Sequence, residues 1–204
     1  MFGYFVLTGN LVAMPQVEQA VVDELVGNAH GNLARVQELL DAHPDALNMS
    51  ATWEETAVQA AAQMGNLPIL DLLIARGAPI DFFTACVLGR VEQVEADLAI
   101  DVARAGARGI HDLPALYFAA IGGNRDIAER LLAAGADVNA RSESAAPIHG
   151  AVLGGRVEMV RLLLARGANP SLPDYKGRDA GQLAEDIGRP DLVKLIEAHA
   201  PVEK

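Results

Sequence analysis

A glycine-centred turn recurs along the chain at an almost constant interval, and this spacing limits the folds open to the sequence. Each turn is a Gly followed by Asn or Arg, and the turns are Gly31-Asn32, Gly65-Asn66, Gly89-Arg90, Gly123-Asn124, Gly155-Arg156 and Gly188-Arg189. Successive glycines are 34, 24, 34, 32 and 33 residues apart. A period of about 33 residues is typical of small structural units stacked side by side. Because a stacked chain has no single closed core, an enclosed, enzyme-like pocket is not the default expectation.

Residues 111–140 show what one such unit contains. Apolar residues at helical spacing begin with Leu116, and Gly122-Gly123 can end this first helix because glycine accepts the left-handed backbone of a helix C-cap. A second helix follows, with Ile127 and Leu131 on one face and charged residues on the other. The sequence therefore predicts an all-α fold in which each unit is a helix, a turn, a second helix and a loop.

The charge balance narrows the choice of partner. The chain has 16 basic and 27 acidic residues, which give a net charge of −11. Binding to a nucleic acid backbone or to anionic lipid needs clustered Lys and Arg, so we expect no nucleic acid and no membrane as a partner. Cys86 is the only cysteine, so neither an internal disulfide nor a thiolate zinc site can form. This composition favours a cytoplasmic protein.

The first 15 residues are apolar and differ from the rest. They are too short to span a membrane, and no Lys or Arg precedes them as in a secretory signal. We expect residues 1–15 to form a flexible arm and 201–204 a short C-terminal tail. Two alternatives stay open for the arm: that Met14 is the real start, or that the arm drives self-assembly.

The motif pieces inside the units resemble the ankyrin repeat. They are Pro147-Ile148-His149, Ala119-Ala120, Gly123-Asn124, Leu131-Leu132 and Gly135-Ala136-Asp137-Val138-Asn139. The family pattern is T-P-L-H-x-A-A, followed by G-H or G-N, then L-L, then G-A-D-V-N. The resemblance extends over roughly residues 16–200. It implies an ankyrin-repeat solenoid whose inner helices line a concave groove and whose outer helices form the back, with hairpin-like finger loops projecting between units.

The resemblance implies six units, with the first and last as caps. Their approximate ranges are 16–48, 49–80, 81–106, 107–139, 140–170 and 171–200. The unit at 81–106 is about ten residues shorter than its neighbours, because only 24 residues separate Gly65 from Gly89. It therefore has little room for a finger.

A search for catalytic arrangements finds no known motif, and we expect no catalytic residue, cofactor or metal. The five histidines are far apart in sequence, and His149 occupies the family's own His position, where it orders a turn. Cys86 is expected to be a small buried apolar residue. Glu54-Glu55 could pass for a carboxylate pair, but a solvated finger tip is the simpler interpretation.

Binding residues are expected on the surface that stacking leaves free, namely the groove and the fingers. Large aromatic residues are the best anchors there. The candidate partner-binding residues are Trp53, Glu55, Gln63, Met64, Leu88, His111, Phe118, Ile121, Arg141, Glu143, Leu153 and Tyr175. Phe118 could equally belong to the core between units, and Trp53 could merely cover the edge of the first helix pair.

Two functions remain open from the sequence. The first is a monomeric, non-enzymatic module that binds a protein or peptide, and the acidic charge predicts a partner with a basic face. The alternative is an enzyme or small-molecule binder with a polar site near the finger at 107–117, where His111, Asp112 and Tyr117 could converge.

Overall fold

The computed structural model describes residues 17–199, so the expected arm at 1–15 and the tail at 201–204 lie outside the described residues. The described chain is all helical, with two isolated bridges, Ser50 to Thr56 and Arg108 to Pro114, and no strand. Its α-helices are α1 (Gln19–Ala29), α2 (Leu33–Ala42), α3 (Ala57–Gln63), α4 (Leu67–Ala75), α5 (Phe82–Leu88), α6 (Val91–Ile100), α7 (Ala115–Gly122), α8 (Arg125–Ala133), α9 (Pro147–Leu153), α10 (Val157–Ala165), α11 (Ala180–Asp186) and α12 (Pro190–Glu197). Three 3₁₀ segments lie between them: η1 (Pro44–Ala46), η2 (Val102–Gly106) and η3 (Ile110–Asp112).

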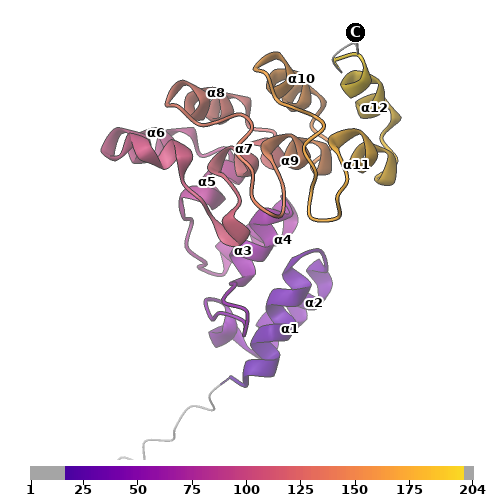
Figure 1. Cartoon of the computed structure of the whole chain (residues 1–204). Helices are drawn as coiled ribbons and strands as arrows, with labels where there is room; N and C mark the ends of the chain where they lie inside the picture. The colour runs from indigo at the N-terminus through magenta and orange to yellow at the C-terminus, as the bar shows by residue number, and fades with distance from the viewer. Residues whose placement is uncertain (1–16, 200–204) are drawn as a thin grey trace, which may run out of the picture.

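The helices of the described chain form six consecutive pairs, which we call units 1 to 6. In Figure 1 the odd-numbered helices α5, α7, α9 and α11 follow one another along one layer, and α6, α8, α10 and α12 along another. The all-α solenoid of helix-turn-helix units predicted from the sequence is confirmed. The exact residue boundaries of the units stay a prediction.

Local sequence explains where the helices begin and end. Five of the six turn glycines adopt a left-handed backbone, with φ between 61° and 79°. The second helix of a unit begins directly after the turn, and in units 1 and 2 the turn asparagine caps it: Asn32 accepts from the N–H of Arg35, and Asn66 from that of Ile69. Such a cap satisfies a backbone donor that the helix itself cannot. The short helices are then held by their neighbours.

Two glycines allow the first helices of units 3 to 5 to approach closely. A Cβ atom at Gly122 in α7 would collide with the carbonyl oxygen of Val87 in α5. A Cβ atom at Gly154, next to α9, would collide with the carbonyl oxygen of Ile121 in α7. Leu131 and Leu163, on the second helices, are fully buried, as the apolar pattern predicts.

Unit 3 interrupts this regular stack. Loops that precede the first helix of units 2, 4, 5 and 6, which we call fingers, span 47–56, 107–114, 134–146 and 166–179, whereas unit 3 has only the connection 76–81. As a result α7 contacts α3 directly, across unit 3. The Tyr117 hydroxyl of α7 donates to the main-chain oxygen of Gln63 at 3.0 Å, 54 residues away in the chain. We call this contact region the junction of units 2 and 4.

The junction corrects two predicted groove residues. Phe118 and Ile121 are fully buried, so neither lies on the groove. The Phe118 ring packs against that of Phe83, with centroids 5.2 Å apart. Ile121 covers Gly65, where an added Cβ would lie only 2.8 Å from its Cγ1 atom. Leu88 is half-buried against the core, and its place near the groove stays a prediction.

Candidate functional site

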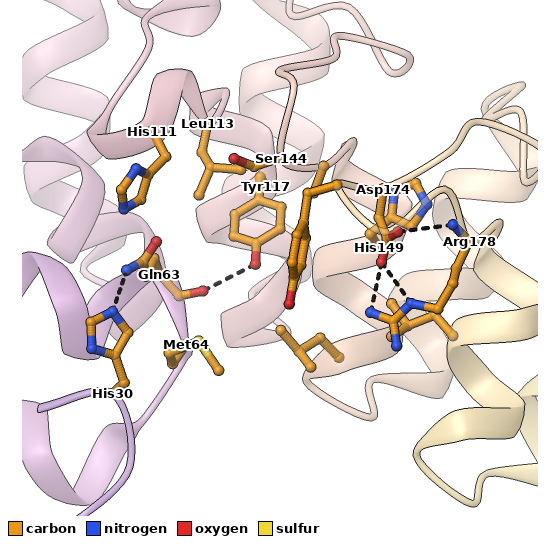
Figure 2. Close-up of a pocket in the computed structure, with 14 residues that line it drawn as sticks. His30, Gln63, Met64, His111, Leu113, Tyr117, Ser144, His149, Asp174 and Arg178 are labelled. Carbon is orange, nitrogen blue, oxygen red and sulfur yellow. Dashed lines mark hydrogen bonds and ion pairs between the residues drawn. The ribbon is translucent and has the colours of Figure 1, made fainter. Parts of the chain in front are cut away.

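A pocket of about 450 Å³ opens between the inner helices and the fingers (Figure 2). Units 1, 2, 4, 5 and 6 contribute to it, and unit 3 contributes no residue among those described. Its lining residues are His30, Gln63, Met64, His111, Leu113, Tyr117, Ser144, Ala145, His149, Leu153, Asp174, Tyr175, Arg178 and Leu183. The pocket therefore exists because the finger of unit 4 lies next to unit 2, with no finger of unit 3 between them.

One end of the pocket is built around the buried carboxylate of Glu55. Glu55 is only 1% exposed and accepts hydrogen bonds from Trp53 Nε1 at 2.8 Å and from Gln63 Nε2 at 2.6 Å. His30 Nε2 lies 3.6 Å and His111 Nε2 3.8 Å from its oxygens. We call these five residues the Glu55 cluster.

The cluster overturns the expectation that Glu55 lies at a solvated finger tip, because the residue is buried. Glu54, the residue before it, has a left-handed backbone with φ of 65°. The Ala51 N–H donates to the Glu55 main-chain oxygen at 2.8 Å, which closes the finger into a tight turn. This geometry leaves Glu54 exposed and directs Glu55 into the protein.

The hydrogen bonds assign the tautomer of His30. Its Nδ1 lies 3.2 Å from the Gly27 carbonyl oxygen, which can only accept, so Nδ1 carries the proton. Its Nε2 then accepts from Gln63 Nε2 at 2.8 Å. The Gln63 amide thus donates to His30 and to Glu55, and Figure 2 shows its side chain between His30 and His111. The network is satisfied when His30 is neutral.

The opposite end of the pocket holds a second buried carboxylate, Asp174. Its Oδ2 accepts from Arg178 Nε at 3.0 Å and from Nη2 at 2.7 Å, and its Oδ1 accepts from the backbone N–H of Lys176 and Arg178. Burial alone would favour the neutral acid, but the hydrogen bonds from Arg178 and the backbone outweigh it and hold the pKa of Asp174 below its usual range. Arg178 also donates to Asp186 at 2.7 Å. The negative charge of Asp174 is therefore balanced within the protein by the guanidinium of Arg178.

His149, beside Asp174, has the structural role expected of it. It is buried, and its Nδ1 accepts from the Ala146 N–H at 3.1 Å, which orders the start of α9. Burial lowers the pKa of His149, although nearby Asp174 and backbone groups of Leu172 and Arg178 oppose the shift. Among the residues that the structure describes, its Nε2 finds no hydrogen-bond partner.

The lining of the pocket also includes apolar side chains, among them Leu113, Leu153 and Leu183. Burial raises the pKa of Tyr117, whose hydroxyl already donates to Gln63, so it is a poor acid or base. Burial also raises the pKa of Cys86 to about 12, as expected for an unreactive thiol. Within residues 17–199, no three His, Cys, Asp or Glu side chains are grouped so that they could hold a metal ion.

The structure brings together some of the candidate residues and separates others. Gln63, Met64, His111, Leu153 and Tyr175 all line the pocket. Trp53 is 45% exposed and joins them through its bond to Glu55.

Arg141 and Glu143 are exposed on the finger of unit 5 but do not line the pocket. Of the three residues in the alternative polar site, His111 and Tyr117 line the pocket. Asp112 lies outside it, 3.5 Å from Arg108.

Several pocket residues were missed by the sequence analysis. The lining residues that it did not propose for binding are His30, Leu113, Ser144, Ala145, His149, Asp174, Arg178 and Leu183. His30 could have been found, because it precedes Gly31-Asn32 as Met64 precedes Gly65-Asn66. The Asp174–Arg178 pair carries no comparable signal, since it depends on how the finger of unit 6 turns.

The comparisons agree with this architecture. A family model described as ankyrin repeats (3 copies) matches residues 25–142, 82–174 and 116–200. The chain therefore belongs to the ankyrin repeat family, whose members generally mediate protein–protein interaction and are typically not enzymes.

Two curated relatives illustrate the range of the family. The chain is 32% identical over 167 residues to a putative ankyrin repeat-containing protein of Treponema pallidum, across 81% of this chain and 48% of the relative. It is 42% identical over 77 residues to a putative E3 ubiquitin-protein ligase, XBAT34, of Arabidopsis thaliana, across 36% of this chain and 20% of the relative. The chain thus spans half or less of the length of these relatives. In the part of the chain that the structure describes, no helix has the length and apolar character needed to cross a membrane.

Proposed function

We propose that this chain is a non-enzymatic interaction module that binds a protein or peptide along the groove between its inner helices and its fingers. One observation carries the proposal: three exposed large apolar residues from three units line the same pocket. They are Met64 of unit 2, Leu153 of unit 5 and Tyr175 of unit 6, and Tyr175 is 69% exposed. Exposed apolar surface gathered in one place usually marks an interaction site.

The charge of the chain supports a partner with a basic face. A net charge of −11 attracts a basic protein at a distance and speeds the encounter, and salt screens this attraction. The association rate should therefore fall as ionic strength rises. A cytoplasmic location and a monomeric state remain predictions from the sequence.

The experiment is affinity capture from native cells with the full chain and two groove variants. Met64→Glu and Leu153→Glu place a charge in the pocket, and both should lose the partner that the unmodified chain retains. Ile100→Glu is the matched control, because Ile100 is an exposed apolar residue on α6 outside the pocket. A partner held equally by all four proteins would show that binding does not use the groove.

The alternative is a small-molecule site in the same pocket. It is favoured by the convergence of His111 and Tyr117 in a cavity of about 450 Å³, within the range of ligand pockets. Thermal unfolding in the presence of a metabolite library tests it: a compound that stabilises the unmodified chain but not Leu153→Glu would support this function.

A further inference from the structure

We propose that the pocket receives one basic side chain of the partner, a lysine or an arginine, with its cationic head at the Glu55 cluster. The proposal rests on the proposed function, because it names the chemistry of the group that enters the groove. It differs from a general attraction between acidic and basic surfaces, since it places one charge at one end of one pocket.

The two buried carboxylates of the pocket differ in what balances them. Asp174 is held by the guanidinium of Arg178. Among residues 17–199, Glu55 has no Lys or Arg within ion-pair distance. The basic side chains within 4 Å of its carboxylate are the imidazoles of His30 and His111. A buried carboxylate without a cation is costly, and an added positive charge nearby is favourable because the surroundings are poorly polarisable. The Glu55 end is therefore the place in the pocket that lacks a cation.

The partner's cation would reach Glu55 through the histidines. The side chain of Glu55 is only 1% exposed, but those of His30 and His111 are 36% and 44% exposed and line the pocket. With His111 Nε2 turned to Glu55, Nδ1 is the ring nitrogen left to accept a proton donor. An ammonium or guanidinium group can donate there, while Nε2 stays 3.8 Å from the Glu55 carboxylate.

The backbone of the unit 4 finger is bent to place His111 in this position. His111 and Asp112 both have left-handed backbones, with φ of 54° and 57°. Two successive non-glycine residues in this region are unfavourable, and such strain persists where the surrounding structure holds it, often at functional sites.

The rest of the pocket suits the stem of a long basic side chain. Met64, Leu113 and Leu153 offer apolar surface to methylene groups, as lysine and arginine stems require. The exposed ring of Tyr175 adds apolar surface to the lining, and its own cationic contact is with Lys176 Nζ, 5.4 Å from the ring centroid.

The first experiment identifies the anchor without knowledge of the natural partner. A random 12-residue peptide library is selected on the full chain at about pH 7.5, where free imidazole is mostly neutral, and peptides that also bind Met64→Glu are discarded. We expect Lys or Arg to be enriched at one position. Replacing that residue by norleucine for Lys, or by citrulline for Arg, keeps the stem without the charge and should weaken binding at least about tenfold, about 1.4 kcal/mol.

The second experiment places a lysine of the protein itself next to Glu55, where the partner's cation is proposed to bind. His111→Lys, at a half-exposed side chain, should weaken the selected peptide about tenfold, whereas the matched control His199→Lys, outside the pocket, should leave binding within about twofold.

The outcomes separate this inference from the proposed function. Selected peptides without an enriched basic residue, or citrulline and norleucine peptides that bind as tightly as the originals, would overturn the basic anchor and leave groove binding standing. Failure to select any groove-dependent peptide would count against both.

Discussion

The stack of units 4 to 6 and the junction of units 2 and 4 are built from the same kind of helix pair but differ in how they pack. In the stack, each first helix contacts the first helix of the next unit, and glycines such as Gly154 permit the close approach. At the junction, α7 contacts α3 over a unit that has no finger. The regular stack gives stability, whereas the irregular junction creates a buried carboxylate, a strained finger and a pocket. The short third unit thus accompanies a place where a first helix contacts a helix two units away.

The largest effect should come from the core of the stack. Leu131→Ala removes a fully buried side chain between units, and the cavity should cost about 2–5 kcal/mol of unfolding free energy. Urea denaturation followed by circular dichroism measures it. A loss below about 1 kcal/mol would mean that the stack is not the stable half of the molecule.

The junction should respond strongly to the loss of Glu55. Glu55→Ala removes the acceptor of the buried Gln63 amide and of Trp53, which is 45% exposed, and should cost about 1–3 kcal/mol, because an unsatisfied buried donor such as Gln63 is unfavourable. The control is Asp112→Asn, which removes the charge of an exposed carboxylate in the facing finger but keeps a side chain that tolerates its left-handed backbone, and should change stability by less than about 0.5 kcal/mol. Equal effects in the same denaturation experiment would show that Glu55 is not buried.

A smaller change tests the contact across unit 3 alone. Tyr117→Phe removes only the hydroxyl that donates to the Gln63 main-chain oxygen, and should cost about 1 kcal/mol. Amide hydrogen exchange should show the loss of protection in α3 as well as in α7. Loss confined to α7 would contradict a direct contact between these helices.

The smallest predicted effect is a pH dependence in the stack. Burial lowers the pKa of His149 in the folded protein, so the unfolded chain takes up this proton at higher pH than the folded chain. Stability from this group is therefore complete above about pH 6.5 and declines as the pH falls below it. The pKa of Asp174 is also lowered, and its contribution declines only in the more acidic range of carboxylates.

Hydrogen exchange in α9 and α11 at about pH 7.5 and pH 5 measures the His149 effect. The variant His149→Gln should flatten the difference, which separates this histidine from those of the Glu55 cluster. An identical pH dependence in the variant would assign the effect to another group.

The regular part of the molecule could be predicted from the sequence, and the junction could not. Turn glycines such as Gly123 predict where a helix ends, and apolar pairs such as Leu131-Leu132 predict which face of a helix is buried. Both depend on local sequence, and the stack agrees with both. Ile121 was misplaced because the family pattern assumes that each unit contacts only its neighbours, whereas α7 reaches Gly65 of unit 2. Phe118 is instead buried against Phe83 of the neighbouring unit 3, the core alternative left open by the sequence.

Glu55 was misplaced for a different reason. Its burial depends on the left-handed backbone of Glu54 and on a finger from a distant unit, and neither is visible in a local pattern. The sequence did reveal the shortened third unit, which is the cause of both departures.

The most direct test of the account restores the missing finger. A segment of about ten residues, the length by which unit 3 is shorter than its neighbours, is inserted between Pro79 and Ile80, and binding of a selected peptide is measured by calorimetry. We predict that the helix content is retained and that peptide binding is lost, because the new finger separates His111 from Glu55 and fills the pocket. Unchanged peptide affinity in a folded insertion variant would contradict the claim that the short unit creates the binding site.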